Sequence, residues 1–565
     1  MEDVLQPFAA VFTSLPAEHF ETVYDKDGVV LRSLVSEGKR WTYLVNASEY
    51  PRKVSIEFTG KGKLQRLGLI SKIQKVSSSC IFTLTIEPYD IVAWKGATGL
   101  EPVSTRVHKQ GNEVKKSKSG PNVLVILSDQ WRASAFGHRG NPDVKTPNID
   151  KLAAEGVEFT NAVSGIPVCS PFRATLMTGQ RPLTNGVFMN DVLLDTNAVS
   201  LAKIMAKAGY QTAYIGKWHL NGHGRSSFIP KGNRRQGFQY WKVLDCTHNY
   251  NHSIYYVDTP DTLIWEGYDA IAQTKDAQKY IMDHVNDEKP FILFLSWGPP
   301  HGPYHTAPQK YKDLYHPAKI QLRPNVPEDL QEKVKKDLSG YYAHCTALDD
   351  MVGLLRQTLQ ETGLDENTII LFVSDHGDLL GSHGYYKKQQ PYDESIRIPM
   401  IYFIPESQSG KARKLDALIN AEDIMPTLLG LTSIEIPKTV EGIDYSSYLK
   451  GGANPGDTVT IISCPQPFGQ WARKNCGKEF RGLRSARYTF TRDLNGPWQL
   501  FDNKKDPYQL HNLIGEYGYD ELINSFNSLL DQKLKETHDQ FLPGKEYTEK
   551  WGYQLDETET VPYTN

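Results

Sequence analysis

The chain has 565 residues, of which 39% are hydrophobic and 23% are charged, and its formal net charge is -3. This composition is typical of a soluble globular protein. The length predicts roughly two or three domains, because a single hydrophobic core rarely grows beyond about 300 residues. The near-neutral charge excludes a nucleic-acid binder that acts through a strong global positive field.

Six scattered cysteines form no CxxC pair, so neither a disulfide framework nor a cysteine zinc site is expected. No apolar run reaches the roughly 20 residues that span a bilayer, and no transmembrane segment is expected. The opening MEDVLQPFAAVF is acidic and lacks the basic stretch and apolar core of a signal peptide. The protein is therefore either cytoplasmic, or a trimmed mature piece of a periplasmic or secreted precursor.

Residues 1–97 alternate short apolar runs with turn-prone segments, which predicts an all-β sandwich without a catalytic set. The runs lie at 29–35, 41–46, 53–58, 67–70, 81–86 and 91–95. The ending EPYDIVAWK resembles the β-sandwich modules that follow the catalytic domain in many glycoside hydrolases, and a generic accessory sandwich is the alternative. The polar segment 98–120, which contains several lysines, is predicted to be a flexible linker.

From residue 121 the pattern changes to buried-type strands that alternate with helical stretches. The strands lie at 122–129, 212–216, 290–297 and 368–374. This alternation predicts an α/β domain over 121–455, with a central, mostly parallel sheet flanked by helices. Residues 456–565 combine short strands, a helix near 519–537 and a tail without clear periodicity, which predicts a small C-terminal α+β subdomain.

The segment VCSPFRATLMTG contains the spacing Cys-x-Pro-x-Arg at Cys169, Pro171 and Arg173. Alone, a cysteine beside a proline is usually structural. The whole segment strongly resembles the signature of type I sulfatases, which belong to the alkaline-phosphatase superfamily. The resemblance implies that a formylglycine-generating enzyme converts Cys169 to formylglycine, whose hydrated aldehyde attacks the sulfur of a sulfate ester. It also implies an alkaline-phosphatase-like fold for the α/β domain.

Two acidic pairs follow predicted strands: Asp129-Gln130 after the first, and Asp375-His376 after a later one. Aspartate often ends strands because it favours turns. Two such strand ends suit oxygen ligation of a hard cation better, because ligands bind at the carboxyl ends of parallel strands. The resemblance implies that these four residues and the modified Cys169 hold one divalent cation, Ca²⁺ in preference to Mg²⁺.

Three further motifs match the sulfatase family. GKWHL places Lys217 and His219 on one side of an extended segment. The resemblance implies that Lys217 binds sulfate and that His219 acts as a general base. SWGPPHGPYH implies that His301 lies near the bridging ester oxygen. In the stretch after the late strand, the spacing of the family motif selects Lys388, with Lys387 as the alternative.

These residues together imply a mechanism in which Arg173, Lys217, Lys388 and the cation stabilise the sulfuryl oxygens, while Lys388 or His301 assists departure of the alcohol. Motifs of the family run from about residue 121 to 540. Two rival hypotheses remain open: a phosphonate or phosphodiester hydrolase of the same superfamily, and an inactive, carbohydrate-binding pseudo-sulfatase.

The segment 226–256 is rich in Arg, His, Tyr and Trp, which suits sulfated or uronate-bearing sugars. The alternative interpretation, which has equal weight, is that this segment is an ordinary polar loop region. The hypothesis is a carbohydrate sulfatase that acts on an oligo- or polysaccharide. Candidate substrate contacts are Arg225, Arg234, Arg235, His248, His305 and Lys387.

Overall fold

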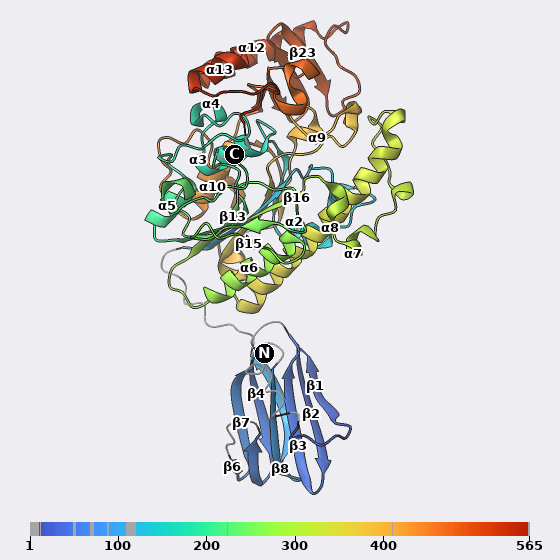
Figure 1. The fold of residues 1–565 in the computed structure, drawn as a ribbon, viewed down its shortest axis with the longest axis vertical. Coiled ribbons are helices and arrows are strands. Elements are labelled where there is room, and N and C mark those ends of the chain that lie inside the picture. Colours follow the sequence, from blue (N-terminus) through green and yellow to red (C-terminus); the bar gives the residue numbers. More distant parts are fainter. Residues whose placement is uncertain are drawn as a thin grey trace. The chain divides into compact units, whose positions relative to one another are not determined.

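The computed structural model describes residues 11, 13–26, 28–48, 52–67, 73–86, 90–108, 120–222, 224–408 and 411–562. The chain divides into two compact units (Figure 1). One comprises residues 1–114 with 361–363, and the other comprises residues 115–360 with 364–565. Among the described residues, no helix is long and apolar enough to cross a membrane.

The N-terminal unit consists of two antiparallel sheets, with the strand orders β1-β2-β3-β8-β5-β6 and β7-β4-β9. The strands are β1 (Glu21–Lys26), β2 (Val29–Ser36), β3 (Lys39–Asn46), β4 (Arg52–Thr59), β5 (Gly62–Arg66), β6 (Ile73–Val76), β7 (Ser79–Ile86), β8 (Ile91–Ala97) and β9 (Glu101–His108). Leu31 and Leu44 of one sheet share a buried core with Ile56 and Phe58 of the other. Two sheets that enclose one core form a sandwich, as predicted.

The strand β9 lies inside the segment 98–120 that the sequence predicts to be a linker. It pairs with β4 along its whole length, from Glu101 opposite Thr59 to His108 opposite Lys53. The sequence EPVSTRVH contains only two valines, and Val103 is 51% exposed, so its hydrophobic pattern was too weak to predict a strand. Of the predicted strand at 67–70, residues 68–70 lie outside the described residues.

The second unit contains an eight-stranded sheet of order β13-β12-β16-β10-β17-β18-β11-β19. Its strands are β10 (Asn122–Asp129), β11 (Val157–Ala162), β12 (Gln211–Lys217), β13 (Tyr240–Leu244), β16 (Phe291–Pro300), β17 (Thr368–Ser374), β18 (Met400–Phe403) and β19 (Arg413–Ile419). Every neighbouring pair is parallel except those that involve β18. The predicted, mostly parallel sheet is confirmed, and the carboxyl ends of β12, β16, β10 and β17 lie along one edge.

Helices cover both faces of this sheet (Figure 1). One face carries α3 (Cys169–Thr178), α5 (Leu201–Lys207) and α10 (Ile424–Leu431), and the other carries α2 (Pro147–Glu155), α6 (Asp269–Asp283) and α8 (Gln331–Thr362). Along β10, Val123 and Val125 enter the first core, whereas Leu124 and Ile126 enter the second. Burial on both faces explains the continuous apolar run of this strand.

The C-terminal subdomain is a four-stranded antiparallel sheet covered by α12 (Asp520–Glu536). Its strands are β20 (Val459–Cys464), β21 (Phe480–Ser485), β22 (Tyr488–Asp493) and β23 (Gly496–Asp502). Phe490 stacks on Phe526 of α12 with ring centroids 5.9 Å apart. The tail also forms a helix, α13 (Gly544–Trp551), which the sequence did not predict. Shorter elements are α4 (Pro182–Asn185), α7 (Gln309–Lys312), α9 (Asp393–Ile396), α11 (Ser446–Leu449), β14 (Ile254–Tyr255) and β15 (Leu263–Ile264).

Candidate active site

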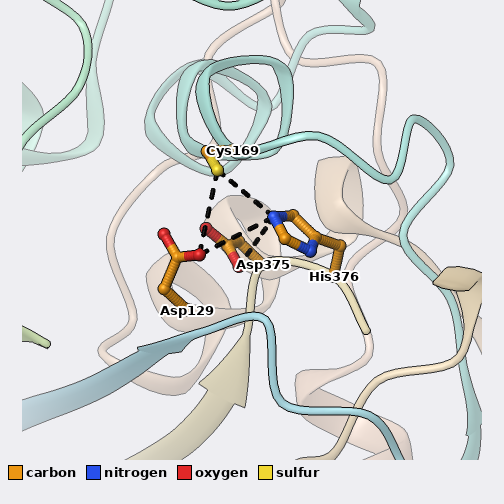
Figure 2. Close-up of side chains that lie close together, drawn as sticks. All are labelled: Asp129, Cys169, Asp375 and His376. Carbon is orange, nitrogen blue, oxygen red and sulfur yellow. Dashed lines mark hydrogen bonds and ion pairs between the residues drawn. The ribbon is translucent and has the colours of Figure 1, made fainter. Parts of the chain in front are cut away.

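Four predicted residues from three separate elements converge at the carboxyl edge of the sheet. Asp129 ends β10, Asp375 and His376 follow β17, and Cys169 is the first residue of α3 (Figure 2). One ligand atom from each lies within 4.8 Å of the others. Each of these side chains is buried. The parallel pairing of β10 with β17 therefore brings together acidic residues that are far apart in sequence.

This cluster has the donor set of a divalent-cation site. His376 Nε2 lies 3.5 Å from Asp375 Oδ1 and 3.8 Å from Asp129 Oδ1. Burial and the charge of Asp129 raise the pKa of Asp375 to about 6. The two buried carboxylates supply oxygen ligands, which a hard cation prefers. The described residues thus fit the predicted metal site.

Gln130 is held in a strained backbone conformation beside this cluster, with φ of 69°. Its Nε2 donates to Asp378 Oδ2 at 2.6 Å, while its Oε1 accepts from Lys388 Nζ at 3.1 Å. The Asp378 carboxylate therefore fixes which end of the amide presents oxygen. Sequence reasoning did not identify Asp378, although it lies in the same DHGD stretch as Asp375.

Two buried cations neutralise the carboxylates. Lys217 Nζ lies 2.5 Å from Asp129 Oδ2. Arg173 Nη2 bridges Asp129 Oδ2 at 3.2 Å and Asp375 Oδ2 at 3.1 Å. Burial by itself would raise the pKa of Asp129, but Lys217 and the surrounding positive charges hold it well below its usual range. Asp129 is thus ionised and able to bind a cation.

The Cys169 sulfur lies among groups that favour negative charge. Lys388 Nζ is 3.3 Å from Sγ, and His376 Nε2 is 3.2 Å from it. Burial and Asp129 would raise the pKa of the thiol, but Lys217 and Lys388 hold it well below its usual range. An anionic group at this position is therefore stabilised electrostatically.

Local packing explains why β12 ends in Gly-Lys. Gly216 has φ of 103°, and a Cβ built on it would lie 2.0 Å from the carbonyl oxygen of Ser296. Only glycine tolerates both conditions. Arg173 Nη1 donates to the Lys217 carbonyl at 2.9 Å and to Ser296 Oγ at 2.8 Å. The glycine thus permits the close strand contact that supports Arg173 and Lys217.

His219 has an acidic partner that the sequence did not reveal. Its Nε2 lies 3.2 Å from Asp191 Oδ1, and Arg225 donates to the same carboxylate at 2.9 and 2.8 Å. Burial lowers the pKa of His219, but Cys246 and the hydrogen bond with Asp191 raise it to about 10. Arg225, predicted as a substrate contact, therefore orients the partner of His219.

His301 and His248 lie together, with ring centroids 4.7 Å apart. His301 Nδ1 donates to the carbonyl oxygen of Gly302 at 2.8 Å. Burial and the positive charge of Lys388 hold the pKa of His301 well below its usual range. Burial and Lys217 lower the pKa of His248 to about 3. Both imidazoles are therefore neutral near pH 7.

Cys169, Lys217, His219 and His301 line a cavity of about 270 Å³. Its lining includes the predicted residues Cys169, Lys217, His219, Arg225, His248, His301, Lys387 and Lys388. It also includes residues that the sequence did not single out. They are Asn190, Cys246, Gln389, Phe468, Gly469, Gln470, Thr558 and Thr560. Asn190 accepts from the Ser170 backbone at 3.0 Å, and the last five belong to the C-terminal part of the chain.

Three predicted substrate contacts lie apart from this catalytic cavity. Arg235 is 1% exposed, and its guanidinium donates to the Ile229 carbonyl at 3.0 Å and to Asp258 at 2.8 Å. These bonds support the local loop, so Arg235 is inaccessible to a substrate. Arg234 donates to Asn221 Oδ1 at 2.9 Å. His305 lines a neighbouring cleft.

The fold and the site fit a hydrolase of anionic esters, because Cys169, which belongs to the candidate cation-ligand cluster, lines one cavity with Lys217 and Lys388. Residues 121–434 match the sulfatase family, and residues 381–537 match the C-terminal region of N-sulphoglucosamine sulphohydrolase. The chain belongs to the sulfatase family and is a sulfuric ester hydrolase.

Two curated relatives illustrate this membership. An ulvan-active sulfatase of Formosa agariphila is 42% identical over 447 residues, which covers 78% of this chain and 87% of the relative. An endo-4-O-sulfatase of Bacteroides thetaiotaomicron is 29% identical, and the match covers 80% of this chain and 98% of the relative.

Solved structures share the fold. A structure from a study of glycosaminoglycan metabolism by Bacteroides thetaiotaomicron has a TM-score of 0.68 at 28% identity, covering 76% of this chain and 98% of that one. A phosphonate monoester hydrolase of Agrobacterium radiobacter has a TM-score of 0.61 at 22% identity, covering 78% and 99%. The second likeness concerns the fold alone.

Proposed function

We propose that this sulfatase hydrolyses sulfate esters on an oligo- or polysaccharide. The observation that carries the proposal is the position of Cys169 Sγ in the lining of the cavity, 3.3 Å from Lys388 Nζ and within the cation-ligand cluster. The names of the two curated relatives, an ulvan-active sulfatase and an endo-4-O-sulfatase, support a carbohydrate substrate.

We further propose that a formylglycine-generating enzyme converts Cys169 to formylglycine, and that Asp129, Gln130, Asp375, His376 and residue 169 hold Ca²⁺, in preference to Mg²⁺. The Cys169 sulfur then marks the place of the nucleophilic oxygen. The cation would supply positive charge when it is bound, and the hydrated aldehyde of residue 169 would supply a nucleophilic hydroxyl. The buried carboxylates and the nearby lysines support both parts of this proposal.

The remaining residues bind the sulfate group and move protons. Lys217 and Lys388 stabilise the charge of the sulfuryl oxygens, and Arg173 positions the carboxylates that it bridges. Because the pKa of His301 lies well below its usual range, Lys388 is the favoured proton donor to the leaving alcohol, and His301 contacts the ester. His219, oriented by Asp191, is the base of the release step, and because its pKa is raised to about 10, the neutral form that accepts the proton is a small fraction near pH 7.

A comparison of three ester types tests the proposed reaction. The enzyme, co-produced with a formylglycine-generating enzyme, is assayed with an aryl sulfate, a phosphonate monoester and a phosphodiester that share one leaving group. We expect kcat/KM to be highest for the sulfate, and Cys169→Ala to abolish all turnover. Faster hydrolysis of the phosphodiester or phosphonate would contradict the proposal. The matched control for Cys169→Ala is Cys476→Ala, which replaces an exposed cysteine.

A panel of defined sulfated oligosaccharides tests the substrate class, since activity restricted to small non-sugar sulfates would overturn it.

The proposal also covers the roles of the other domains and the location of the enzyme. The N-terminal β-sandwich acts as an accessory module to the catalytic domain at 121–455, with 456–565 as a subdomain of the same enzyme. The location is periplasmic or secreted, which suits a polymer that does not cross membranes.

A further inference from the structure

A second, larger cleft adjoins the catalytic cavity. Its volume is about 980 Å³, against about 270 Å³ for the cavity itself. The two share His248, His301 and Lys387 in their linings, and Gln130, which lies beside the cation-ligand cluster, also borders the larger cleft. A molecule that reaches the nucleophile can therefore extend continuously into the larger cleft.

The wall of this cleft is basic. Lys312, Lys333, Lys336 and Lys387 line it, and Asp337 is the one carboxylate among its described lining residues. Asp337 is already engaged, because Lys333 Nζ lies 2.8 Å from it. The other three lysines therefore leave a net positive field in the cleft, which favours an anionic ligand.

Lys312 and Lys336 project from helices, whereas Lys387 lies in an irregular segment. Lys312 ends α7, and its Nζ donates to the His305 carbonyl at 3.2 Å. An ammonium group has three donors, so this bond leaves capacity for an anion. Lys336 is an exposed residue on the first turns of α8. Gly340 of α8 packs directly on Tyr304, since a Cβ there would lie 2.4 Å from the Tyr304 carbonyl oxygen.

Aromatic side chains complete the lining. Tyr304, Tyr315 and Tyr386 border the cleft, and Lys333 Nζ lies 3.6 Å above the ring of Tyr386. Tyr304 donates to Asp378, the carboxylate that also fixes Gln130. Aromatic faces beside ammonium groups suit sugar rings that carry acidic substituents.

We propose that this cleft is a subsite that binds the sulfate or carboxylate group of a neighbouring sugar in the same chain. The enzyme then prefers oligomers and polymers with several acidic groups over single sulfated sugars. This inference rests on the proposed function, since it extends the substrate beyond the residue that loses sulfate. Lys312 and Lys336 are specificity-determining residues for the length and charge of the substrate.

The double variant Lys312→Gln/Lys336→Gln tests this inference in the modified, metal-loaded enzyme. With a multiply sulfated tetrasaccharide we expect KM to rise about fivefold and kcat to stay unchanged, because each exposed charge contact contributes modestly. With a small aryl sulfate, kcat/KM stays at the wild-type value. Lys335→Gln is the matched control, because Lys335 neighbours Lys336 on α8 and pairs with Glu332.

An unchanged KM for the tetrasaccharide, or an equal loss on both substrates, would overturn the subsite. A wild-type enzyme that hydrolyses no sulfate ester would instead contradict the proposed function. Two modified tetrasaccharides identify the anion: one retains only the reacting sulfate, and the other has its carboxyl groups reduced. If the wild-type enzyme has a higher KM for one modified form than for the unmodified tetrasaccharide, the group missing from that form is the one that the cleft recognises. An unchanged KM for both modified forms would contradict anion recognition.

Discussion

His219 and Asp191 form an imidazole–carboxylate pair, with His219 Nε2 3.2 Å from Asp191 Oδ1 at the edge of the catalytic cavity. Arg225 also binds Asp191 and donates two hydrogen bonds to the same carboxylate. The hydrogen bond with Asp191 contributes to the raised pKa of His219, about 10. The pKa of the proposed base is thus raised by Cys246 and by Asp191, both of which lie outside the recognisable motifs.

Replacing Asp191 by Asn should move the pH dependence of turnover. Loss of the carboxylate removes a group that raises the pKa of His219, so neutral imidazole is present at lower pH. We expect the rising limb of the kcat–pH profile to shift to lower pH, with a rate loss of about 10- to 100-fold from the lost orientation. Asp195→Asn is the control, and an unshifted limb in Asp191→Asn would contradict the assignment of His219 as base.

Removal of the metal should reduce both activity and stability. The buried carboxylates of Asp129 and Asp375 lose a counter-charge, so EDTA treatment should abolish turnover and lower Tm by about 3–8 °C. Calorimetry with added Ca²⁺ or Mg²⁺ checks this, and Ca²⁺ should restore Tm at the lower concentration. Asp375→Asn should lose this response. A fully active, unshifted enzyme after EDTA treatment would refute the metal site.

Gly216→Ala should destabilise the protein by about 2–4 kcal/mol and reduce activity, because the new Cβ would clash with the Ser296 carbonyl as well as adopt positive φ. Gly209→Ala is a close control. Its φ is 94° and no atom lies within 4 Å of the built Cβ, so only the conformational cost of about 1 kcal/mol remains. Equal free energies of unfolding for the two variants would show that the strand contact is unimportant.

Glu158 should contribute stability that acid removes. Its Oε1 lies 2.7 Å from both His138 Nε2 and Arg139 Nε. Burial alone would raise the pKa of Glu158, but His138 and Arg139 lower it from 4.5 to about 2. The contribution is therefore present above pH 4.5 and lost as the pH falls toward 2.

Glu158→Gln should accordingly lower the free energy of unfolding by about 1–3 kcal/mol at pH 7, and by much less near the acid end. Urea denaturation across this range measures the difference. Glu155→Gln, which removes a 40% exposed partner of Arg356, should change stability little at any pH. A constant deficit of Glu158→Gln at every pH would rule out the proposed linkage.

The strands that carry the site were predictable because both of their faces are buried. The runs before Asp129 and Asp375 are continuously apolar, and parallel pairing of β10 with β17 places their ends together. The short motifs around Cys169 and Lys217 were predictable from their resemblance to the family, and the structure brings these residues into one cavity.

Other features left no readable pattern. Asp191 and Asp378 are single carboxylates in irregular segments, and only tertiary contacts with His219 and Gln130 distinguish them. Arg235 fits the composition of a substrate loop, but its hydrogen bonds to Ile229 and Asp258 occupy it. The strand β9 has weak hydrophobic periodicity and depends on its pairing with β4. Helix α13 has only eight residues, and its Tyr547 packs on Phe188, which is distant in sequence.

Mass spectrometry of the peptide that contains Cys169, combined with a sulfate-release assay on the same sample, tests whether Cys169 is the precursor of the nucleophile. After co-production with a formylglycine-generating enzyme, the peptide should be about 18 Da lighter than the thiol form. The rate of sulfate release should rise in proportion to the converted fraction. Full activity with an intact Cys169 thiol, or complete conversion without sulfate release, would contradict the assignment of Cys169 as the precursor of the nucleophile.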